Sequence, residues 1–234
     1  MAKKTYFITG TNTGVGKTIA TAALLEAAKE QGLTTLAMKP IASGCHQTPD
    51  GLRNDDALLL QDAMTEKLPY ESINPITLEP AIAPHVAAQQ AGKQVSAQRI
   101  VGFCRGNQIR PADLMLVEGA GGWRVPLNDR ETYAAVPREM GMPVILVVPL
   151  QLGCINHALL SVEAIRADGL KVAGWIGNHP EAEPMECEQE TLNYLSLHLK
   201  APCLGVLPWI EGKPDNDLPR ELRKYLSVAP LVEN

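Results

Sequence analysis

The sequence has 234 residues, of which 45% are hydrophobic and 20% are charged, without a low-complexity run or a repeat of fixed period. This composition supports one folded domain with a sizeable core and argues against disorder and solenoid architectures. Its 21 basic and 26 acidic residues give a net charge of −5 with no cluster of lysine and arginine, which disfavours nucleic acid or an anionic membrane as a partner and favours a small ligand.

The N-terminal residues and the cysteines bear on the compartment. Residues 1–4 run directly into a β-like segment without the apolar stretch and cleavage site of a signal peptide, and no run reaches about 18 apolar residues. Five cysteines occur singly, without a C-x-x-C pair: Cys45, Cys104, Cys154, Cys187 and Cys203. That pattern fits a reducing compartment and argues against a zinc site or a disulfide framework. We therefore expect a cytoplasmic protein.

Short apolar runs alternate with helical patterns along the chain. In order, the patterns predict strands over residues 6–9, 34–38, 114–117, 144–148, 171–176 and 203–207, and helices over 19–31, 96–107, 156–167 and 185–199. The runs 114–117 and 144–148 are apolar throughout, which is typical of strands buried on both faces. Strands separated by helices need crossover connections. We therefore predict an α/β fold of the P-loop NTPase type, one domain over residues 1–234, with a mostly parallel sheet covered by helices on both faces.

The stretch GTNTGVGKT, from Gly10 to Thr18, lies between the first strand and the first helix. Strand, glycine-rich turn and helix are the context of a phosphate-binding loop, in which Lys17 would reach the terminal phosphates and the Thr18 hydroxyl would bind Mg²⁺. The common pattern leaves about four residues between its first glycine and the Gly-Lys-Thr triplet. Here five residues, Thr11 to Val15, separate Gly10 from Gly16, so the loop is a longer variant. The loop alone does not name a reaction, because switches, kinases and ligases share it.

Two acidic positions are candidates for a metal site. Glu118 ends the apolar run LMLV and precedes the glycine-rich GAGG, so it is placed to hold Mg²⁺ beside the loop, although a solvated acid in a turn remains the alternative. Asp55 and Asp56 open a helical pattern, where either acid could equally cap the helix.

A second lysine follows the second strand. Lys39 ends the run LAM, and a parallel sheet would bring it to the same edge as Lys17. Two lysines and Mg²⁺ would suit a substrate that carries a carboxylate or carbamate and accepts the γ-phosphoryl group. Ser43 could donate a hydrogen bond to that substrate. Taken alone, Lys39 could equally be an ordinary solvated lysine.

Seven motifs in the same order resemble the dethiobiotin synthetases. They span Gly10 to Trp209 and read GTNTGVGKT, KPIASG, GLRNDDA, VEGAGGW, LGCINHALL, AGWIGN and GVLPW. The resemblance implies an ATP- and Mg²⁺-dependent cyclo-ligase of biotin biosynthesis, which converts 7,8-diaminopelargonic acid and CO₂ to dethiobiotin with release of ADP and phosphate. It implies a carbamate, a carbamic-phosphoric mixed anhydride and no covalent enzyme intermediate.

The resemblance also implies roles for residues. Thr18, Asp56 and Glu118 would surround Mg²⁺, Lys17 would bind phosphates, and Lys39 would stabilise the carbamate and the transferring phosphoryl group. Thr13 and Ser43 would contact the diamine or its carbamate. Further nucleotide contacts would come from Gly14, Val15, Gly16, Ile19, Gly119, Ala120, Gly121, Asn178, Pro208, Trp209, Ile210 and Asp215. For Trp209, packing in the core is the alternative.

The same resemblance implies a homodimer. The segment Gly153, Cys154, Ile155 and Asn156 would open a helix whose N-terminus receives the substrate carboxylate in the other subunit's site. Two positions depart from the family: Gly14, which can be acidic in relatives, and His179, where an aspartate is expected. A partition or division-site ATPase would carry a further lysine where this chain has Asn12. That class, and a kinase of a small metabolite, are the alternatives.

Overall fold

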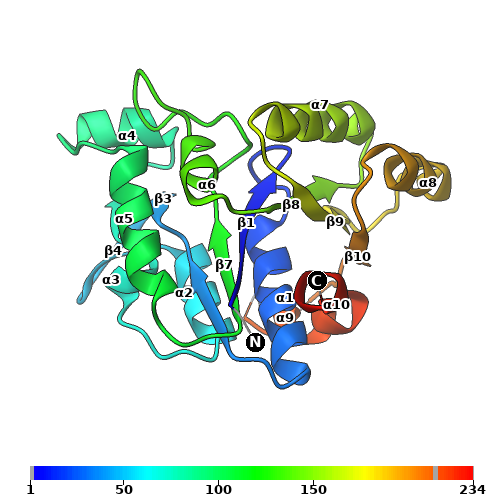
Figure 1. Ribbon diagram of the computed structural model, residues 1–234, viewed down its shortest axis with the longest axis horizontal. Coiled ribbons are helices and arrows are strands. Elements are labelled where there is room, and N and C mark those ends of the chain that lie inside the picture. The colour runs from blue at the N-terminus through cyan, green and yellow to red at the C-terminus, as the bar shows by residue number, and fades with distance from the viewer. Residues whose placement is uncertain (1–2, 213–215, 234) are drawn as a thin grey trace.

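A six-stranded sheet forms the centre of the computed structural model, which describes residues 3–212 and 216–233. The strand order is β10-β9-β8-β1-β7-β2, and every neighbouring pair is parallel (Figure 1). The strands are β1 (Lys4–Gly10), β2 (Thr35–Met38), β7 (Leu114–Glu118), β8 (Val144–Pro149), β9 (Val172–Asn178) and β10 (Cys203–Leu207). β7 and β8 are buried along their whole length, as the unbroken apolar runs predicted.

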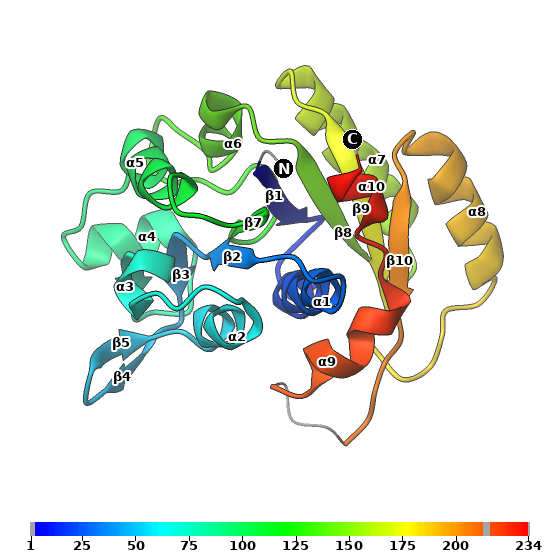
Figure 2. The same ribbon diagram turned by 60° about the horizontal axis from the view of Figure 1, so that its bottom comes forward.

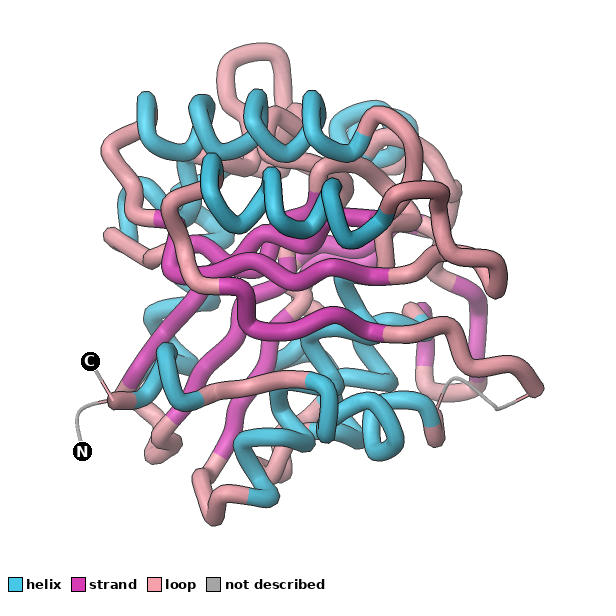
Figure 3. Tube along the Cα trace, turned by 90° about the vertical axis from the view of Figure 1, so that its right-hand side faces the viewer, coloured by secondary structure: helices cyan, strands magenta, loops and turns pink. Residues whose placement is uncertain are grey.

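Helices cover both faces of the sheet. On one face lie α1 (Lys17–Glu30), α2 (Asp55–Ala63) and α9 (Leu218–Leu222), and on the other lie α5 (Ala97–Gln108), α6 (Ala135–Met140), α7 (Cys154–Ala167) and α8 (Glu188–His198) (Figure 2). Figure 3 shows the three layers from the side, with the strands between two layers of helices. The predicted α/β class, with a parallel sheet covered on both faces, is confirmed.

The smaller elements gather around residues 41–90 and at the C-terminal end. They are the parallel pair β3 (Ile41–Ser43) and β6 (Ile76–Leu78), the hairpin β4 (His46–Thr48) and β5 (Gly51–Arg53), the helices α3 (Tyr70–Ile73), α4 (Pro84–Gln90) and α10 (Ala229–Val232), and a 3₁₀ turn (Arg223–Tyr225). The sequence patterns did not predict them, because segments of three to seven residues are too short to establish a period.

All six predicted strands and all five predicted helices, including the one that Asp55 and Asp56 open, are present, with some boundaries shifted by a few residues. α8 begins at Glu188 rather than at residue 185, because Cys187 takes a left-handed conformation with φ of 53°. α1 begins at Lys17 rather than at residue 19, directly after Gly16 with φ of 87°. Across the described ranges, no helix is long and apolar enough to cross a membrane.

The register of the sheet brings the predicted motifs to one edge. Ile8 of β1 pairs with Glu118 of β7, and Asn178 of β9 pairs with both Pro149 and Leu207. The residues that follow the carboxyl ends of the strands therefore emerge side by side, where ligands of parallel α/β sheets bind.

Candidate active site

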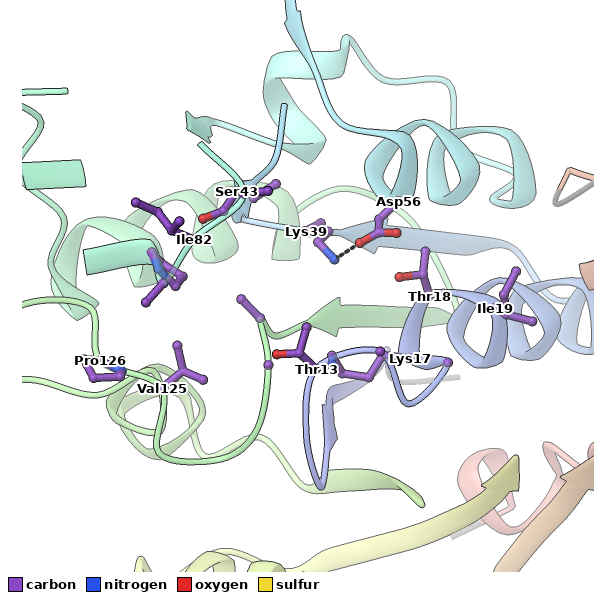
Figure 4. A pocket seen from close by; sticks show the side chains of 18 residues that line it. Thr13, Lys17, Thr18, Ile19, Lys39, Ser43, Asp56, Ile82, Val125 and Pro126 are labelled. Atoms are coloured by element: carbon purple, nitrogen blue, oxygen red, sulfur yellow. Dashed lines mark hydrogen bonds and ion pairs between the residues drawn. The ribbon is translucent and has the colours of Figure 1, made fainter. Parts of the chain in front are cut away.

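A cavity of about 700 Å³ opens at this edge of the sheet. Figure 4 shows the labelled side chains of Lys39 and Ser43 on one side of it, and those of Thr13 and Lys17 on the other. Eighteen residues line the cavity: Thr13, Gly14, Gly16, Lys17, Thr18, Ile19, Lys39, Ala42, Ser43, Asp56, Ala81, Ile82, Ala83, Pro84, Ala120, Gly121, Val125 and Pro126. The structure thus brings together most of the predicted loop, metal and catalytic positions.

The glycine-rich loop is compact and packs against the end of β9. Gly16 has φ of 87°, and a Cβ atom on it would collide with the Asn178 amide; that amide donates a hydrogen bond to the Val15 carbonyl at 3.2 Å. Two reasons therefore require glycine at this position: the positive φ angle, and the lack of space for a Cβ atom beside Asn178. Lys17 reaches back across the loop and donates to the Asn12 carbonyl at 3.0 Å. Burial lowers the pKa of Lys17 to about 8, against the opposing effect of the Glu118 carboxylate.

Lys39 lies between two carboxylates. Its ammonium group donates to Glu118 Oε1 at 2.7 Å and to Asp56, the contact drawn as a dashed line in Figure 4. The Thr18 hydroxyl donates to the same Glu118 oxygen at 2.8 Å. Burial by itself would lower the pKa of Lys39, but Glu118 and Asp56 outweigh it and raise the pKa. Burial by itself would raise the pKa of Asp56, but the charge of Lys39 and its hydrogen bond outweigh burial and lower the pKa.

Asp56 is free to face this cluster because another residue caps α2. The Asn54 side chain accepts the N-cap hydrogen bond from the Ala57 amide at 3.3 Å, so neither Asp55 nor Asp56 is needed there. Local sequence had left both acids open as caps.

The oxygen atoms around Lys39 fit a hard cation. Glu118 is fully buried, and among the described residues its Oε2 atom has no hydrogen-bond partner, which is costly for a carboxylate unless a further ligand satisfies it. The Thr18 hydroxyl and the Asp56 carboxylate are the neighbouring oxygen groups that could join Glu118 as metal ligands, and oxygen ligands suit Mg²⁺. Within residues 3–212 and 216–233, no group of three or more His, Cys, Asp and Glu side chains has metal-binding geometry; this candidate has two carboxylates and one hydroxyl.

The cavity also has an apolar side that the motifs did not predict. It is lined by residues 81–83, which precede α4, by Pro84 at the start of α4, and by Val125 and Pro126 after β7. Ser43 faces the same cavity with a buried hydroxyl that finds no hydrogen-bond partner in the part of the chain that the structure describes. Only tertiary contacts bring residues 81–84 and 125–126 together, so no local pattern in the sequence could have found them.

Of the described positions assigned to the nucleotide base, Asn178 contacts the loop, and none lines the cavity. Pro208, Trp209 and Ile210 follow β10, next to Asn178. Trp209 is 49% exposed, so the alternative that it packs in the core is wrong. Asp215 lies outside the described residues. His179, the departure from the family, contacts the Leu207 carbonyl at 2.9 Å and Glu188 at 2.6 Å.

The segment assigned to the substrate carboxylate starts α7. Gly153 is its N-cap with φ of 93°, Cys154 is buried, and Asn156 is exposed. None of the residues 153–156 lines the cavity of its own chain. Val15, Glu118 and Gly119 also do not line it: Val15 and Glu118 are buried beneath the surface, and the Gly119 amide bonds to the Ile8 carbonyl.

The loop, the strand-end carboxylate and the parallel sheet define the P-loop NTPase class. The septum site-determining protein MinD of Pyrococcus horikoshii, solved with Mg-ADP, matches with a TM-score of 0.57 and 18% identity over 98% of this chain and 95% of its own. A ParA family ATPase of Chlorobium tepidum matches with a TM-score of 0.55 and 16% identity, over 99% and 95%. At such identity the likeness shows the fold alone.

Sequence similarity identifies the family. A family model described as an AAA domain matches residues 4–213. The ATP-dependent dethiobiotin synthetase BioD of Marinobacter nauticus is 76% identical over the whole of both chains, and that of Cellvibrio japonicus is 54% identical, again over both chains. BioD 1 of Escherichia coli O157:H7 is 43% identical over 97% of this chain and 99% of its own. The chain belongs to the ATP-dependent dethiobiotin synthetases, a family of ligases.

Proposed function

We propose that the protein closes the ureido ring of dethiobiotin from 7,8-diaminopelargonic acid and CO₂, with ATP converted to ADP and phosphate. The relatives' names support the product and the use of ATP. The observation that carries the proposal at the level of chemistry is the buried lysine Lys39, which lies between Glu118 and Asp56 on the wall of the cavity beside the phosphate loop.

The proposed chemistry needs positioning and charge neutralisation more than covalent catalysis. One amine adds to CO₂ and forms a carbamate, whose oxygen then receives the γ-phosphoryl group. The second amine attacks the resulting mixed anhydride, the ring closes and phosphate leaves. No covalent enzyme intermediate is required. Lys39 would neutralise the carbamate and the transferring group, and the unpartnered Ser43 hydroxyl would donate to the same oxygens.

ATP would bind along the glycine-rich loop. Lys17 would move from the Asn12 carbonyl to the terminal phosphates, and Thr13 would face the carbamate. Thr18, Asp56 and Glu118 would hold Mg²⁺, which neutralises charge on phosphate oxygens when bound. The remaining proposed nucleotide contacts are Gly14, Val15, Gly16, Ile19, Gly119, Ala120, Gly121, Asn178, Pro208, Trp209 and Ile210.

We also propose a homodimer of single-domain subunits that acts in the cytoplasm. The N-terminus of α7, from Gly153 to Asn156, would receive the substrate carboxylate in the partner's cavity. The exposure of this helix end, with the neighbouring Leu152 95% exposed, supports that arrangement. Helix-end amides and the helix dipole can bind a carboxylate without a cationic side chain.

The decisive test is fixation of labelled bicarbonate into acid-stable product with MgATP, with and without 7,8-diaminopelargonic acid, alongside phosphate release. Diamine-dependent fixation matched by phosphate release is the expected result. Lys39→Met should lower kcat by about 10²-fold or more. Lys29→Met is the matched control, since Lys29 also pairs with a glutamate, Glu26 at 2.8 Å, but does not line the cavity.

The other classes predict different results in the same assay. Phosphate release without the diamine and without label fixation would contradict the synthetase and favour a regulatory ATPase. Transfer of the γ-phosphoryl group to a metabolite without label fixation would favour a small-metabolite kinase.

A further inference from the structure

One wall of the cavity is an irregular segment. Between the end of β7 at Glu118 and the start of α6 at Ala135, the chain has no helix or strand of the sheet, only an isolated bridge between Pro126 and Thr132. This segment contributes Ala120, Gly121, Val125 and Pro126 to the cavity. Figure 4 shows Val125 and Pro126 across the cavity from Lys39. Backbone hydrogen bonds within the segment, such as the one from the Tyr133 N–H to the Val125 carbonyl at 2.7 Å, hold its two ends together. Its position against the sheet depends on contacts with other elements.

Trp123 and Arg124, directly before the two wall residues, share one anchor. The Trp123 indole is buried edge-on against Phe7, with ring centroids 6.1 Å apart, and its N–H donates to Asp168 Oδ2 at 2.8 Å. The Arg124 guanidinium donates to both oxygens of the same carboxylate, at 2.6 and 3.2 Å. The Asp168 side chain is only 11% exposed. The Arg124 side chain is 51% exposed, so solvent screens the charge of the pair, but its bidentate geometry is specific.

The stability of α7 does not account for an aspartate at this position. Asp168 is the C-cap of α7, and a carboxylate at a helix C-terminus is electrostatically unfavourable because that end carries partial negative charge. The partners of the side chain account for it instead: Trp123, Arg124 and, at 4.0 Å, Arg138. Asp168 thus stabilises the irregular segment between β7 and α6 rather than α7.

We infer that Asp168 is a positioning residue for substrate binding, acting through Trp123 and Arg124 on the wall formed by Val125 and Pro126. The inference rests on the proposed function, because it assigns that wall to the diamine rather than to ATP. The loop that would bind the ATP phosphates has its own anchors, the Asn178 amide and the start of α1. The proposed nucleotide contacts Gly119, Ala120 and Gly121 lie earlier in the same segment, where Gly121 and Gly122 approach the loop. Loosening Val125 and Pro126 should therefore weaken diamine binding more than ATP binding.

The test compares Asp168→Asn with wild type in the bicarbonate assay. Asparagine presents an amide N–H₂ to the Arg124 guanidinium and removes the charge. We expect the KM for the diamine to rise about tenfold, equal to about 1.4 kcal/mol, while the KM for ATP stays within about twofold. Asp168→Glu, which keeps the carboxylate, should recover part of the loss. Trp123→Phe keeps the ring on Phe7 but removes the N–H, and should shift the diamine KM in the same direction.

Asp113→Asn is the matched control. Its carboxylate also accepts two hydrogen bonds, from the Thr34 amide and hydroxyl, but it precedes β7 at the opposite edge of the sheet. It should leave both KM values unchanged. Two results for Asp168→Asn would overturn the inference but not the proposed function. One is a fall in kcat with an equal rise in the KM for the diamine and the KM for ATP, and the other is a KM for the diamine within twofold of wild type. A wild type that fixes no label with the diamine would overturn the proposed function and the inference with it.

Discussion

Lys39 and Glu118 each make the burial of the other's charge tolerable. Glu118 is fully buried and Lys39 is nearly so, and their side chains are 2.7 Å apart. Two charges taken out of water are tolerated when they pair, but removing one partner leaves an uncompensated buried charge. The same residues are thus needed for the proposed chemistry and for the stability of the fold, and the two roles need separate measurements.

Lys39→Met should lower the free energy of unfolding by about 3 kcal/mol at pH 7, because it leaves Glu118 as an unpaired buried carboxylate. The double variant Lys39→Met/Glu118→Gln removes that charge and should recover part of the stability, but none of the activity. Urea unfolding followed by circular dichroism measures both. A double variant no more stable than the single one would contradict the dependence of the two charges on each other.

If Lys17 binds the ATP phosphates as proposed, nucleotide binding should be linked to its protonation. Its pKa in the folded protein is lowered to about 8, below its ordinary value. Below pH 8 the lysine is charged in both folded and unfolded states; above it the folded state loses the proton first, so this group makes folding more favourable as pH rises from 8 toward the ordinary value. Phosphates would restore the charge.

At pH 9, Lys17 should be about nine-tenths neutral in the ligand-free protein, and ATP binding should take up close to one proton. At pH 7 the uptake should be near zero. Titration calorimetry in buffers of different ionisation enthalpy measures it. Lys17→Arg keeps a permanent charge and should abolish the uptake at pH 9; uptake that persists in this variant would assign the proton to another group.

At the scale of elements, the start of α2 shows what local sequence can and cannot decide. The helical pattern after GLRN is visible in the sequence, but Asn54, Asp55 and Asp56 are all good capping residues. The choice is made by tertiary contacts: the Asn54 backbone N–H donates to the Tyr70 hydroxyl at 2.8 Å, which holds Asn54 at the cap position. Asp56 is then the second residue of the helix, two positions after the cap, where its side chain meets Lys39.

Asn54→Ala should therefore affect both stability and catalysis. Loss of the cap should lower the free energy of unfolding by about 1 kcal/mol, and looser positioning of Asp56 should lower kcat/KM several-fold. Ser96→Ala is the matched control, since Ser96 caps α5 through the Arg99 amide at 3.3 Å and does not line the cavity. It should cost similar stability with kcat/KM unchanged. Equal effects of the two variants on kcat/KM would show that the α2 cap has no special role.

At the scale of the molecule, burial on both faces made the sheet predictable. The strands at its centre are continuous apolar runs, and their carboxyl ends carry the motifs, so the edge that holds the loop, Lys39 and Glu118 followed from the order of elements. The apolar wall of the cavity could not be predicted from the order of elements. Ile82, Val125 and Asp168 belong to segments without a motif, and only the packing of the whole chain brings them to the site. The solved structures of MinD and ParA proteins share the sheet at 16–18% identity, which is why the fold could not choose between a ligase and a regulatory ATPase.

The proposed dimer predicts that two inactive variants can restore activity when their subunits are mixed. If the N-terminus of α7 serves the partner's cavity, Lys39→Met and Asn156→Asp damage different halves of each site. Asn156 is exposed in the first turn of α7, where an added carboxylate favours the helix but repels the substrate carboxylate. Each variant alone should be nearly inactive. Mixed subunits should form heterodimers with one undamaged site, and random pairing should return about a quarter of the wild-type activity.

Activity after unfolding and refolding the two variants together measures this, with variants refolded separately and then mixed as the control. Refolding together that restores nothing, while sedimentation shows dimers, would place each complete site within a single chain.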